Sequence, residues 1–242
     1  MRSGWGSEDC LSLHVWSPPQ ALTAAAPPLP VLVYIHGGSL MSGSGQFEDK
    51  TAFALHAGAG AGSVVVSVNY RLNIFGWLAV AALQEDSGAV GNYGVCACVH
   101  ATKRIKSEHD NKTSTSIIHH TSDPTRAAAR VPSPSPPNPF CHRPTGPTSC
   151  AAVGARDNIA AFGGDPRRVT VAGQSSGGTS ILALYCSPRS RGLFDGAVSL
   201  SGSINITMGL QQAFEQNEAV LHALNCSGGV RRAPCSVGVV DV

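Results

Sequence analysis

Gly173-Gln174-Ser175-Ser176-Gly177-Gly178 lies where a predicted strand meets a predicted helix in this 242-residue chain. The β-branched residues of segment 168–173 predict the strand, and the apolar pattern of segment 176–185 predicts the helix. A G-x-S-x-G sequence at such a junction is typical of a serine nucleophile on a sharp turn, where glycines make room for the bent backbone. A glycine-rich turn without chemistry is the alternative, and the flanking strand and helix argue against it. The sequence therefore predicts Ser175 as a catalytic nucleophile.

A second glycine-rich segment, His36-Gly37-Gly38-Ser39, follows the continuous apolar run of residues 31–35. Acyl transfer through a tetrahedral intermediate needs backbone N–H donors that point at the developing oxyanion. A glycine loop at the end of a strand can supply two such donors, and the residue after the nucleophile can supply a third. We therefore predict an oxyanion hole from the N–H groups of Gly38, Ser39 and Ser176. Taken alone the segment is typical of a tight turn, and its pairing with the serine turn favours the catalytic interpretation.

Apolar runs alternate with helical patterns in both outer parts of the chain, and this alternation predicts an α/β fold. Continuous apolar runs are typical of strands buried on both faces of a parallel sheet, and strand–helix–strand units connect parallel neighbours. The alternating segment 11–16 predicts a half-buried strand, and residues 210–224 carry the stripe of an amphipathic helix. We predict buried strands at residues 31–35, 64–70, 168–173 and 196–201, with a short helix within 47–57. The expected architecture is a mostly parallel sheet flanked by helices.

The composition excludes several classes of protein. An apolar share of 43% with 13% charged residues is ordinary for a globular chain. No apolar run approaches the roughly 18 residues that a membrane-spanning helix needs, so no transmembrane segment is expected. Residues 1–6 lack the apolar core of a signal peptide. A net charge of +2 without a concentrated basic face argues against a nucleic-acid partner.

Residues 95–154 break the α/β pattern. Half of the 16 prolines of the chain fall within 124–147, and no apolar periodicity of a helix continues through the segment. A connecting helix should lie between the second and third buried strands, and we expect it to be absent between Gly94 and Arg156. Residues 96–151 are expected to remain outside the sheet, because proline-rich segments without periodicity bury too little apolar surface to fold.

The chain is therefore divided into three parts. Residues 1–94 are expected to form the N-terminal part of one domain, 95–154 a Pro-rich, disordered insert, and 155–242 the nucleophile part of the same domain. A mis-spliced or intron-retaining gene model would produce the same middle segment. Its Cys96 and Cys98 have a C-x-C spacing that does not fit the C-x₂₋₄-C pairs of zinc sites, so no metal is expected there.

The two glycine-rich motifs and the segments around them resemble the type-B carboxylesterases and cholinesterases. The likeness covers most of residues 7–94 and 156–228 and is carried by residues 7–16, 66–72, 75–78, 91–94, 158–166, 192–197 and 200–203. It implies an incomplete α/β-hydrolase fold and hydrolysis of a small-molecule carboxylic ester through an acyl-enzyme on Ser175, with no cofactor. Two positions depart from the family pattern, because Ser39 replaces a third glycine and Gln174 replaces a glutamate.

The resemblance also implies an acid and a histidine that follow the serine in the chain. Downstream of Ser175, His222 is the sole histidine, and Asp195, Glu215 and Glu218 are the acids before it. We reject His222 as the general base because it falls within the predicted amphipathic helix and not on a loop after a late strand. His36 is interpreted as structural. No catalytic acid or histidine is therefore assigned in this chain, and the isolated chain is expected to be inactive.

Two other functions compete with an ester hydrolase. A non-catalytic, cholinesterase-like interaction protein is one, although such relatives typically lose the serine that this chain keeps. A truncated or faulty gene product without activity is the other. The residues that would identify the ester are expected in the part that the resemblance implies to be missing, and nothing predicts the oligomeric state.

Overall fold

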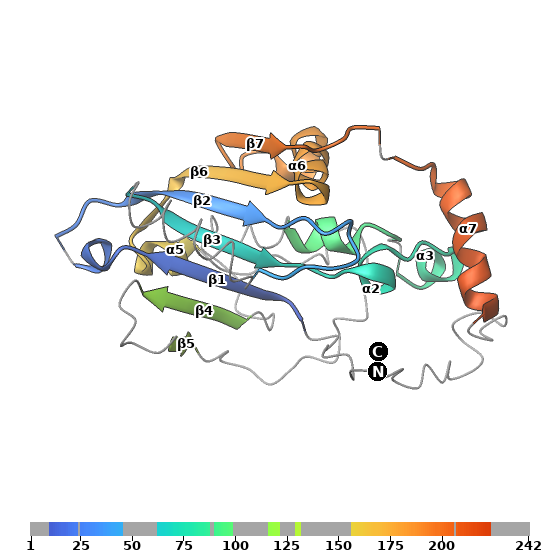
Figure 1. The fold of residues 1–242 in the computed structure, drawn as a ribbon, viewed down its shortest axis with the longest axis horizontal. Coiled ribbons are helices and arrows are strands. Elements are labelled where there is room, and N and C mark those ends of the chain that lie inside the picture. The colour runs from blue at the N-terminus through green and yellow to red at the C-terminus, as the bar shows by residue number, and fades with distance from the viewer. Residues whose placement is uncertain are drawn as a thin grey trace.

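The computed structural model of the chain describes residues 10–23, 25–45, 62–87, 90–98, 116–121, 129–131, 156–205 and 207–223. Within these residues seven strands form one sheet in the order β5-β4-β1-β3-β2-β6-β7 (Figure 1). The strands are β1 (Ser12–Ser17), β2 (Leu29–Ile35), β3 (Val64–Asn69), β4 (Ser116–Thr121), β5 (Ala129–Val131), β6 (Gly164–Gln174) and β7 (Gly196–Leu200). The helices are η1 (Pro19–Leu22), α2 (Asn73–Trp77), α3 (Ala81–Ser87), α5 (Arg156–Ala161), α6 (Ser176–Cys186), η4 (Pro188–Ser190) and α7 (Leu210–Ala223).

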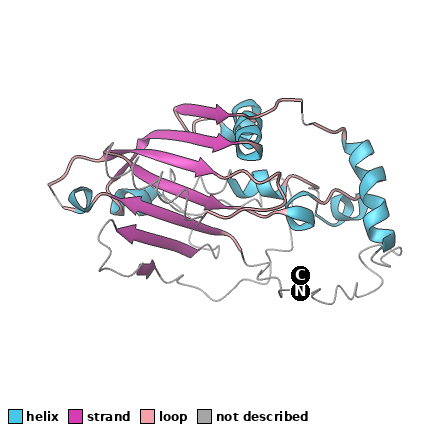
Figure 2. Cartoon of the chain, in the orientation of Figure 1, coloured by secondary structure: helices cyan, strands magenta, loops and turns pink. Residues whose placement is uncertain are grey.

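The centre of the sheet is parallel, as the sequence predicted. β2 pairs in parallel with both β3 and β6, and β6 pairs in parallel with β7, whereas β1 runs antiparallel to β3. Val33 and Ile35 of β2 and Val64 and Val66 of β3 are fully buried, as expected for strands covered on both faces. The carboxyl ends of β2, β3, β6 and β7 point to the same end of the sheet, where α2, α3, α6 and α7 also lie (Figures 1 and 2).

Strand β1 is buried more completely than its alternating sequence predicted. Leu13 and Val15 belong to the main core, while Trp16 packs with Val65 in a second cluster on the other side of the sheet. His14 is 2% exposed and its ring stacks on Trp16, with 5.9 Å between the ring centroids. Both faces of β1 are therefore covered, and the expectation that one face of this strand meets solvent was wrong.

The first part of the middle segment is ordered into the core, contrary to the expectation of a missing helix. Residues 93–98 are helical, and Cys98 is fully buried in the main hydrophobic cluster, with Val95 and Ala97 packed against it. Burial raises the pKa of the Cys98 thiol to about 12, so this cysteine is a neutral core residue. Six residues are too few to show a helical period in the sequence, and packing stabilises a turn that propensity alone does not predict.

Two further parts of the predicted insert pair with the sheet. β4 runs parallel to β1, and β5 runs antiparallel to β4. The expectation that residues 96–151 remain outside the sheet was therefore wrong for 116–121 and 129–131. The edge of β1 that faces away from β3 offers unpaired N–H and C=O groups, which an extended, β-branched segment can satisfy. Apart from 116–121 and 129–131, residues 99–154 lie outside the described residues. The helix predicted within 47–57 also lies outside them.

Helix α6 packs against β6, β7 and β2, and α5 packs against β6. Ile181 and Leu184 of α6 and Ile159 of α5 are buried in the main cluster. The predicted amphipathic helix is present as α7, but none of its residues is buried and Leu210 is 46% exposed. No helix among the described residues is both long and apolar enough to cross a bilayer.

Candidate active site

Ser175 occupies a strained turn between β6 and α6. Its φ of 56° and ψ of −124° are rarely adopted by a residue with a side chain. The turn is held from both sides, because the Ser175 N–H donates to the Leu200 carbonyl at 2.8 Å and the Ser175 carbonyl accepts from the Thr179 N–H at 2.9 Å. β7 and α6 thus fix a conformation that costs of order 1–3 kcal/mol.

The glycines around Ser175 are required by close backbone contacts. A methyl group on Gly177 would lie 2.1 Å from the Ile35 carbonyl oxygen, and one on Gly173 would lie 2.5 Å from the Gly177 carbonyl carbon. A methyl group on Gly178 would lie 2.8 Å from the Leu200 carbonyl oxygen. The start of α6 therefore sits directly on the ends of β2 and β7, and any side chain at these positions would push it away.

The loop formed by residues 37–43, here called the glycine loop, lies against this turn. β2 and β6 end side by side, with Ile35 opposite Gly173. A methyl group on Gly37 would lie 3.1 Å from Ser175 Cβ and 2.6 Å from the Gln174 carbonyl oxygen. The loop and the Ser175 turn therefore lie so close that no side chain fits between them, at the carboxyl edge of the sheet, the place where α/β folds bind their ligands.

The glycine loop has an unusual backbone that several hydrogen bonds stabilise. Gly38 has a φ of 122°, and both Ser39 and Leu40 lie in the left-handed region with φ values of 55° and 62°. The N–H groups of Met41 and Ser42 both donate to the Gly38 carbonyl at 3.0 Å. Two bonds from Asn73, at the start of α2, hold the outer side of the loop: its N–H donates to the Leu40 carbonyl at 2.9 Å and its Nδ2 to the Met41 carbonyl at 2.8 Å.

His36 and Tyr70 form the buried support beneath the glycine loop. The two rings stack with 4.4 Å between their centroids, and each residue is at most 1% exposed. The Tyr70 hydroxyl donates to the His36 carbonyl at 2.7 Å. Burial raises the pKa of Tyr70 far above its usual range, so the phenol keeps the proton that it donates. These contacts agree with the interpretation of His36 as structural.

The four residues that the sequence singled out converge, whereas the other titratable candidates do not. Ser175, Ser176, Gly38 and Ser39 lie together at the ends of β6 and β2. His222, Glu215 and Glu218 are all exposed on α7. Asp195 precedes β7 at the opposite end of that strand, where its carboxylate accepts the Val169 N–H at 3.1 Å and its own N–H donates to the Val169 carbonyl at 2.8 Å. Asp195 therefore aligns β7 with β6 and lies about 20 Å along the strand from Ser175.

Sequence reasoning missed the groups that hold the glycine loop. Asn73, Tyr70 and the hydroxyl of Ser176 all contact it or the carbonyl that precedes it. Tyr70 had one detectable signal, since a tyrosine at the end of a buried strand must find a partner for its hydroxyl. The contacts of Asn73 and Ser176 span distant parts of the chain and have no local signature.

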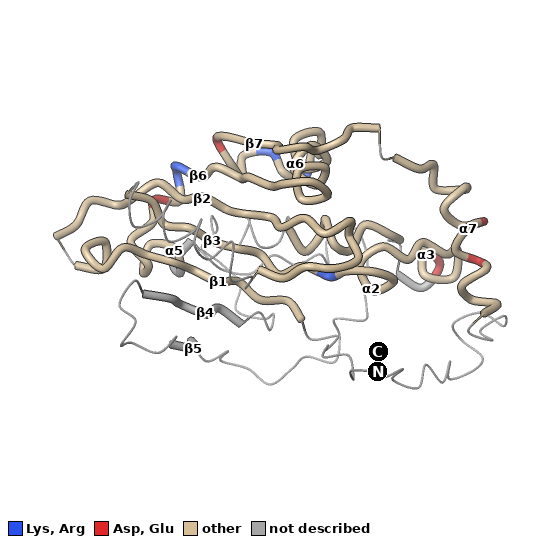
Figure 3. Tube along the Cα trace, viewed as in Figure 1, with Lys and Arg blue, Asp and Glu red and all other residues tan. Residues whose placement is uncertain are grey.

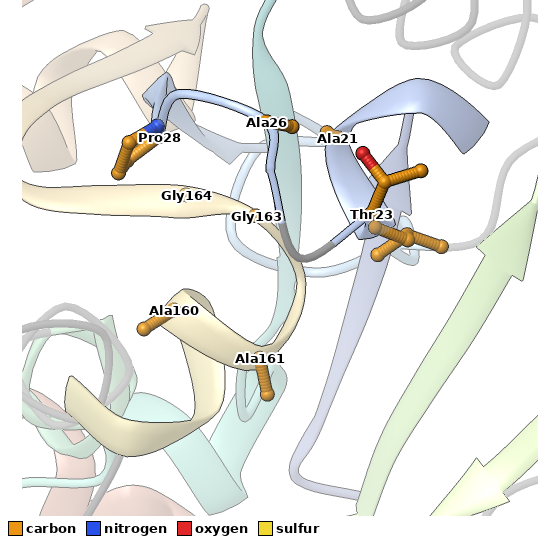
Figure 4. A pocket seen from close by; sticks show the side chains of 9 residues that line it. Ala21, Thr23, Ala26, Pro28, Ala160, Ala161, Gly163 and Gly164 are labelled. Carbon is orange, nitrogen blue, oxygen red and sulfur yellow. The ribbon is translucent and has the colours of Figure 1, made fainter.

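Two other features of the described residues do not form a site. An open cavity of about 340 Å³ lies between the loop after η1 and the start of β6, lined mainly by alanine and glycine (Figure 4). It faces the amino end of β6, so roughly 30 Å of strand separates it from Ser175. Among the described residues, Asp165 pairs with Arg167 and Arg168 at the amino end of β6, and the other charged residues are dispersed (Figure 3). No group of three His, Cys, Asp or Glu side chains that could hold a metal lies in this part of the chain.

Comparison with known proteins identifies the family. The model of the Carboxylesterase family matches residues 1–108 and 155–235. The chain belongs to the carboxylesterase family. The family match omits residues 109–154, and the α/β-hydrolase fold is incomplete in this chain.

The chain is similar to esterases and to an acyl-CoA hydrolase, and it covers only part of each. Carboxylesterase 3B of Mus musculus is 33% identical over 202 residues, which cover 84% of this chain and 25% of that protein. The medium-chain Fatty acyl-CoA hydrolase precursor of Anas platyrhynchos is 31% identical over 220 residues, covering 91% of this chain and 29% of that protein. A solved PNB esterase matches with a TM-score of 0.60 and 29% identity, covering 90% of this chain and 34% of that one. The chain thus spans little more than a quarter of the length of these curated relatives.

Proposed function

We propose that this carboxylesterase-family chain carries the nucleophile and the oxyanion hole of a carboxylic ester hydrolase. The observation that carries the proposal is the contact between the strained Ser175 turn and the glycine loop. A strained turn persists only where the surrounding structure enforces it. A non-catalytic interaction protein would gain nothing from keeping both the serine and its strained backbone.

In the proposed reaction the Ser175 hydroxyl attacks the ester carbonyl and an acyl-enzyme forms as the alcohol leaves. The N–H groups of Gly38, Ser39 and Ser176 stabilise the oxyanion, helped by the N-terminal end of α6, which begins at Ser176. Water then attacks the acyl-enzyme and releases the acid. Only peptide N–H groups, a hydroxyl and water take part in these roles, so this chain's residues perform them without a cofactor.

The general base and its acid partner are proposed to come from residues outside those described. His222 is exposed on α7, and Asp195 is engaged with Val169 at the far end of β7. A serine hydroxyl without a base is a weak nucleophile at neutral pH. We therefore propose that residues 1–242 alone have no useful esterase activity, whereas a longer protein that also supplies the family's acid and histidine turns esters over.

Replacement of Ser175 tests the proposal. In the active protein, Ser175→Ala should abolish labelling by a fluorophosphonate and lower kcat for a short-chain p-nitrophenyl ester by roughly 10⁶-fold, as nucleophile removal does in a well-studied serine protease. Ser187→Ala, at the other end of α6, is the matched control and should keep both activities. Labelling that persists in the Ser175→Ala variant would show that another residue is the nucleophile.

A further inference from the structure

The hydroxyl of Ser176 links the nucleophile helix to the glycine loop. The Leu40 N–H donates to Ser176 Oγ across 3.3 Å, although the two residues are 136 positions apart in the chain. Ser176 is the first residue of α6 and is 9% exposed, so water competes little for this bond. Leu40 follows Ser39, whose N–H is one proposed oxyanion donor, and the N–H of Ser176 is another. The bond therefore links two parts of the proposed oxyanion hole.

The same hydroxyl also acts on the buried support of the loop. Burial raises the pKa of Tyr70, and the Ser176 side chain opposes this effect in the lowering direction. Tyr70 uses its one proton on the His36 carbonyl at 2.7 Å, so toward Ser176 its oxygen can only accept. A donor to the phenol oxygen stabilises the phenolate, which explains the direction of that effect.

Two hydrogen bonds therefore hold the two sides of the loop. The Leu40 N–H donates to Ser176 Oγ, and the Tyr70 hydroxyl donates to the His36 carbonyl. The two bonds lie on either side of Gly38 and Ser39. The first ties Leu40 to the start of α6, and the second fixes the carbonyl that precedes the loop.

We propose that the Ser176 hydroxyl is a positioning group that fixes the glycine loop against the nucleophile turn, in addition to the role of the Ser176 N–H. This inference rests on the proposed function for its effect on catalysis, but not for its effect on the loop. Left-handed φ values at Ser39 and Leu40 make the loop costly to hold in place. A fixed link to α6 is therefore what keeps the N–H groups of Gly38 and Ser39 aligned with the oxyanion.

Amide hydrogen exchange at Leu40, followed by NMR on residues 1–242, tests the link without any need for activity. Ser176→Ala should speed exchange at Leu40 by roughly 2- to 12-fold, the range for losing one hydrogen bond. Ser176→Thr keeps the hydroxyl and should restore slow exchange. Ser180→Ala is the matched control, because Ser180 is a buried serine one turn along α6 whose hydroxyl bonds to the Ser176 carbonyl at 3.0 Å and not to the loop. Unchanged exchange at Leu40 in Ser176→Ala would overturn the proposal.

Ester hydrolysis by the active protein tests whether the link matters to the reaction. Ser176→Ala should lower kcat by roughly 10-fold and change KM by less than about twofold, because misaligned oxyanion donors affect the transition state more than substrate binding. Ser176→Thr should recover kcat. Faster exchange at Leu40 with an unaltered kcat would overturn the positioning role. A wild-type protein without Ser175-dependent turnover would instead refute the proposed function, and the exchange measurement would still decide whether the link exists.

Discussion

Ser39 combines a proposed oxyanion role with a backbone conformation that serine rarely adopts. Its φ of 55° lies in the left-handed region, where glycine is at no steric disadvantage. The family's usual glycine at this position is therefore the conformationally easier choice. Serine is tolerable because the role assigned to it needs only the N–H.

Three variants of Ser39 separate its backbone from its side chain. Ser39→Gly should retain kcat and raise the free energy of unfolding by about 0.5–1 kcal/mol, since it relieves the left-handed strain. Ser39→Ala should match wild type. Ser39→Pro should lower kcat/KM at least 100-fold, because proline removes the donor and cannot adopt a positive φ. Ester kinetics and thermal unfolding measure both effects, and a large loss of activity in Ser39→Ala would mean that the hydroxyl itself takes part.

Tyr70 predicts a pH dependence of stability. Burial raises its folded-state pKa above the ordinary value of about 10, so its contribution to stability is complete below pH ~10 and declines as the pH rises above that value. Burial raises the pKa values of Tyr34 and Tyr93 in the same direction. Urea unfolding of Tyr70→Phe between pH 8 and 11 should therefore show a shallower alkaline decline than wild type. Tyr185→Phe, at a position that is 73% exposed, is the control and should keep the wild-type slope.

The junction of α6 with β2 and β7 depends on three glycines rather than on large side chains. Gly177 is the most constrained of these, because its Cα hydrogen faces the Ile35 carbonyl. The helix and the strand ends approach each other so closely that the Ser175 turn and the glycine loop come into contact. Close packing of backbone on backbone is thus what assembles the candidate site.

Gly177→Ala should separate these elements. The added methyl group would meet the Ile35 carbonyl oxygen at 2.1 Å, so α6 must move, and we expect a loss of about 1–3 kcal/mol in the free energy of unfolding. Gly209→Ala is a matched control, since a methyl group there meets no atom within 4 Å and should change stability by less than about 1 kcal/mol. Denaturant unfolding compares the two, and equal stabilities would contradict the packing that we describe.

The sheet ends at β7 in an edge that remains apolar. Within the described residues β7 pairs only with β6, and Val198 and Leu200 are 43% and 51% exposed. The matches cover only 25% and 29% of two relatives in the carboxylesterase family, and the helix after β7 has no buried residue in this chain. An unpaired strand of this kind is a template for pairing with another strand.

We expect residues 1–242 to associate through this edge with a second copy of the chain. Val198→Lys should weaken the association at least 10-fold, because a charge on the edge strand must be desolvated when two strands pair. Sedimentation velocity over a range of protein concentrations measures the effect. Ile204→Lys, at a 67% exposed position beyond the strand, should leave the association intact. Equal weakening by both variants would show general apolar adhesion instead of edge pairing.

The sequence by itself determined the parallel centre of the sheet, the Ser175 turn and the family, because each depends on local or nearest-neighbour forces. Runs such as residues 31–35 and 64–69 form buried strands since valine and isoleucine suit an extended backbone covered on both faces. The spacing of glycines around Ser175 reflects steric demands within a few residues of it. Such demands leave a pattern that can be read without knowing the rest of the fold.

Only the tertiary structure decided which distant groups meet. It placed residues 93–98 in a helix with Cys98 in the core, paired 116–121 with β1, and brought Ser176 to Leu40. None of these contacts has a local period or motif, because an open strand edge accepts many extended segments and a hydroxyl bonds to whichever donor packing presents. These contacts depend on the packing of the whole core, because that packing brings residues far apart in the chain close enough to bond.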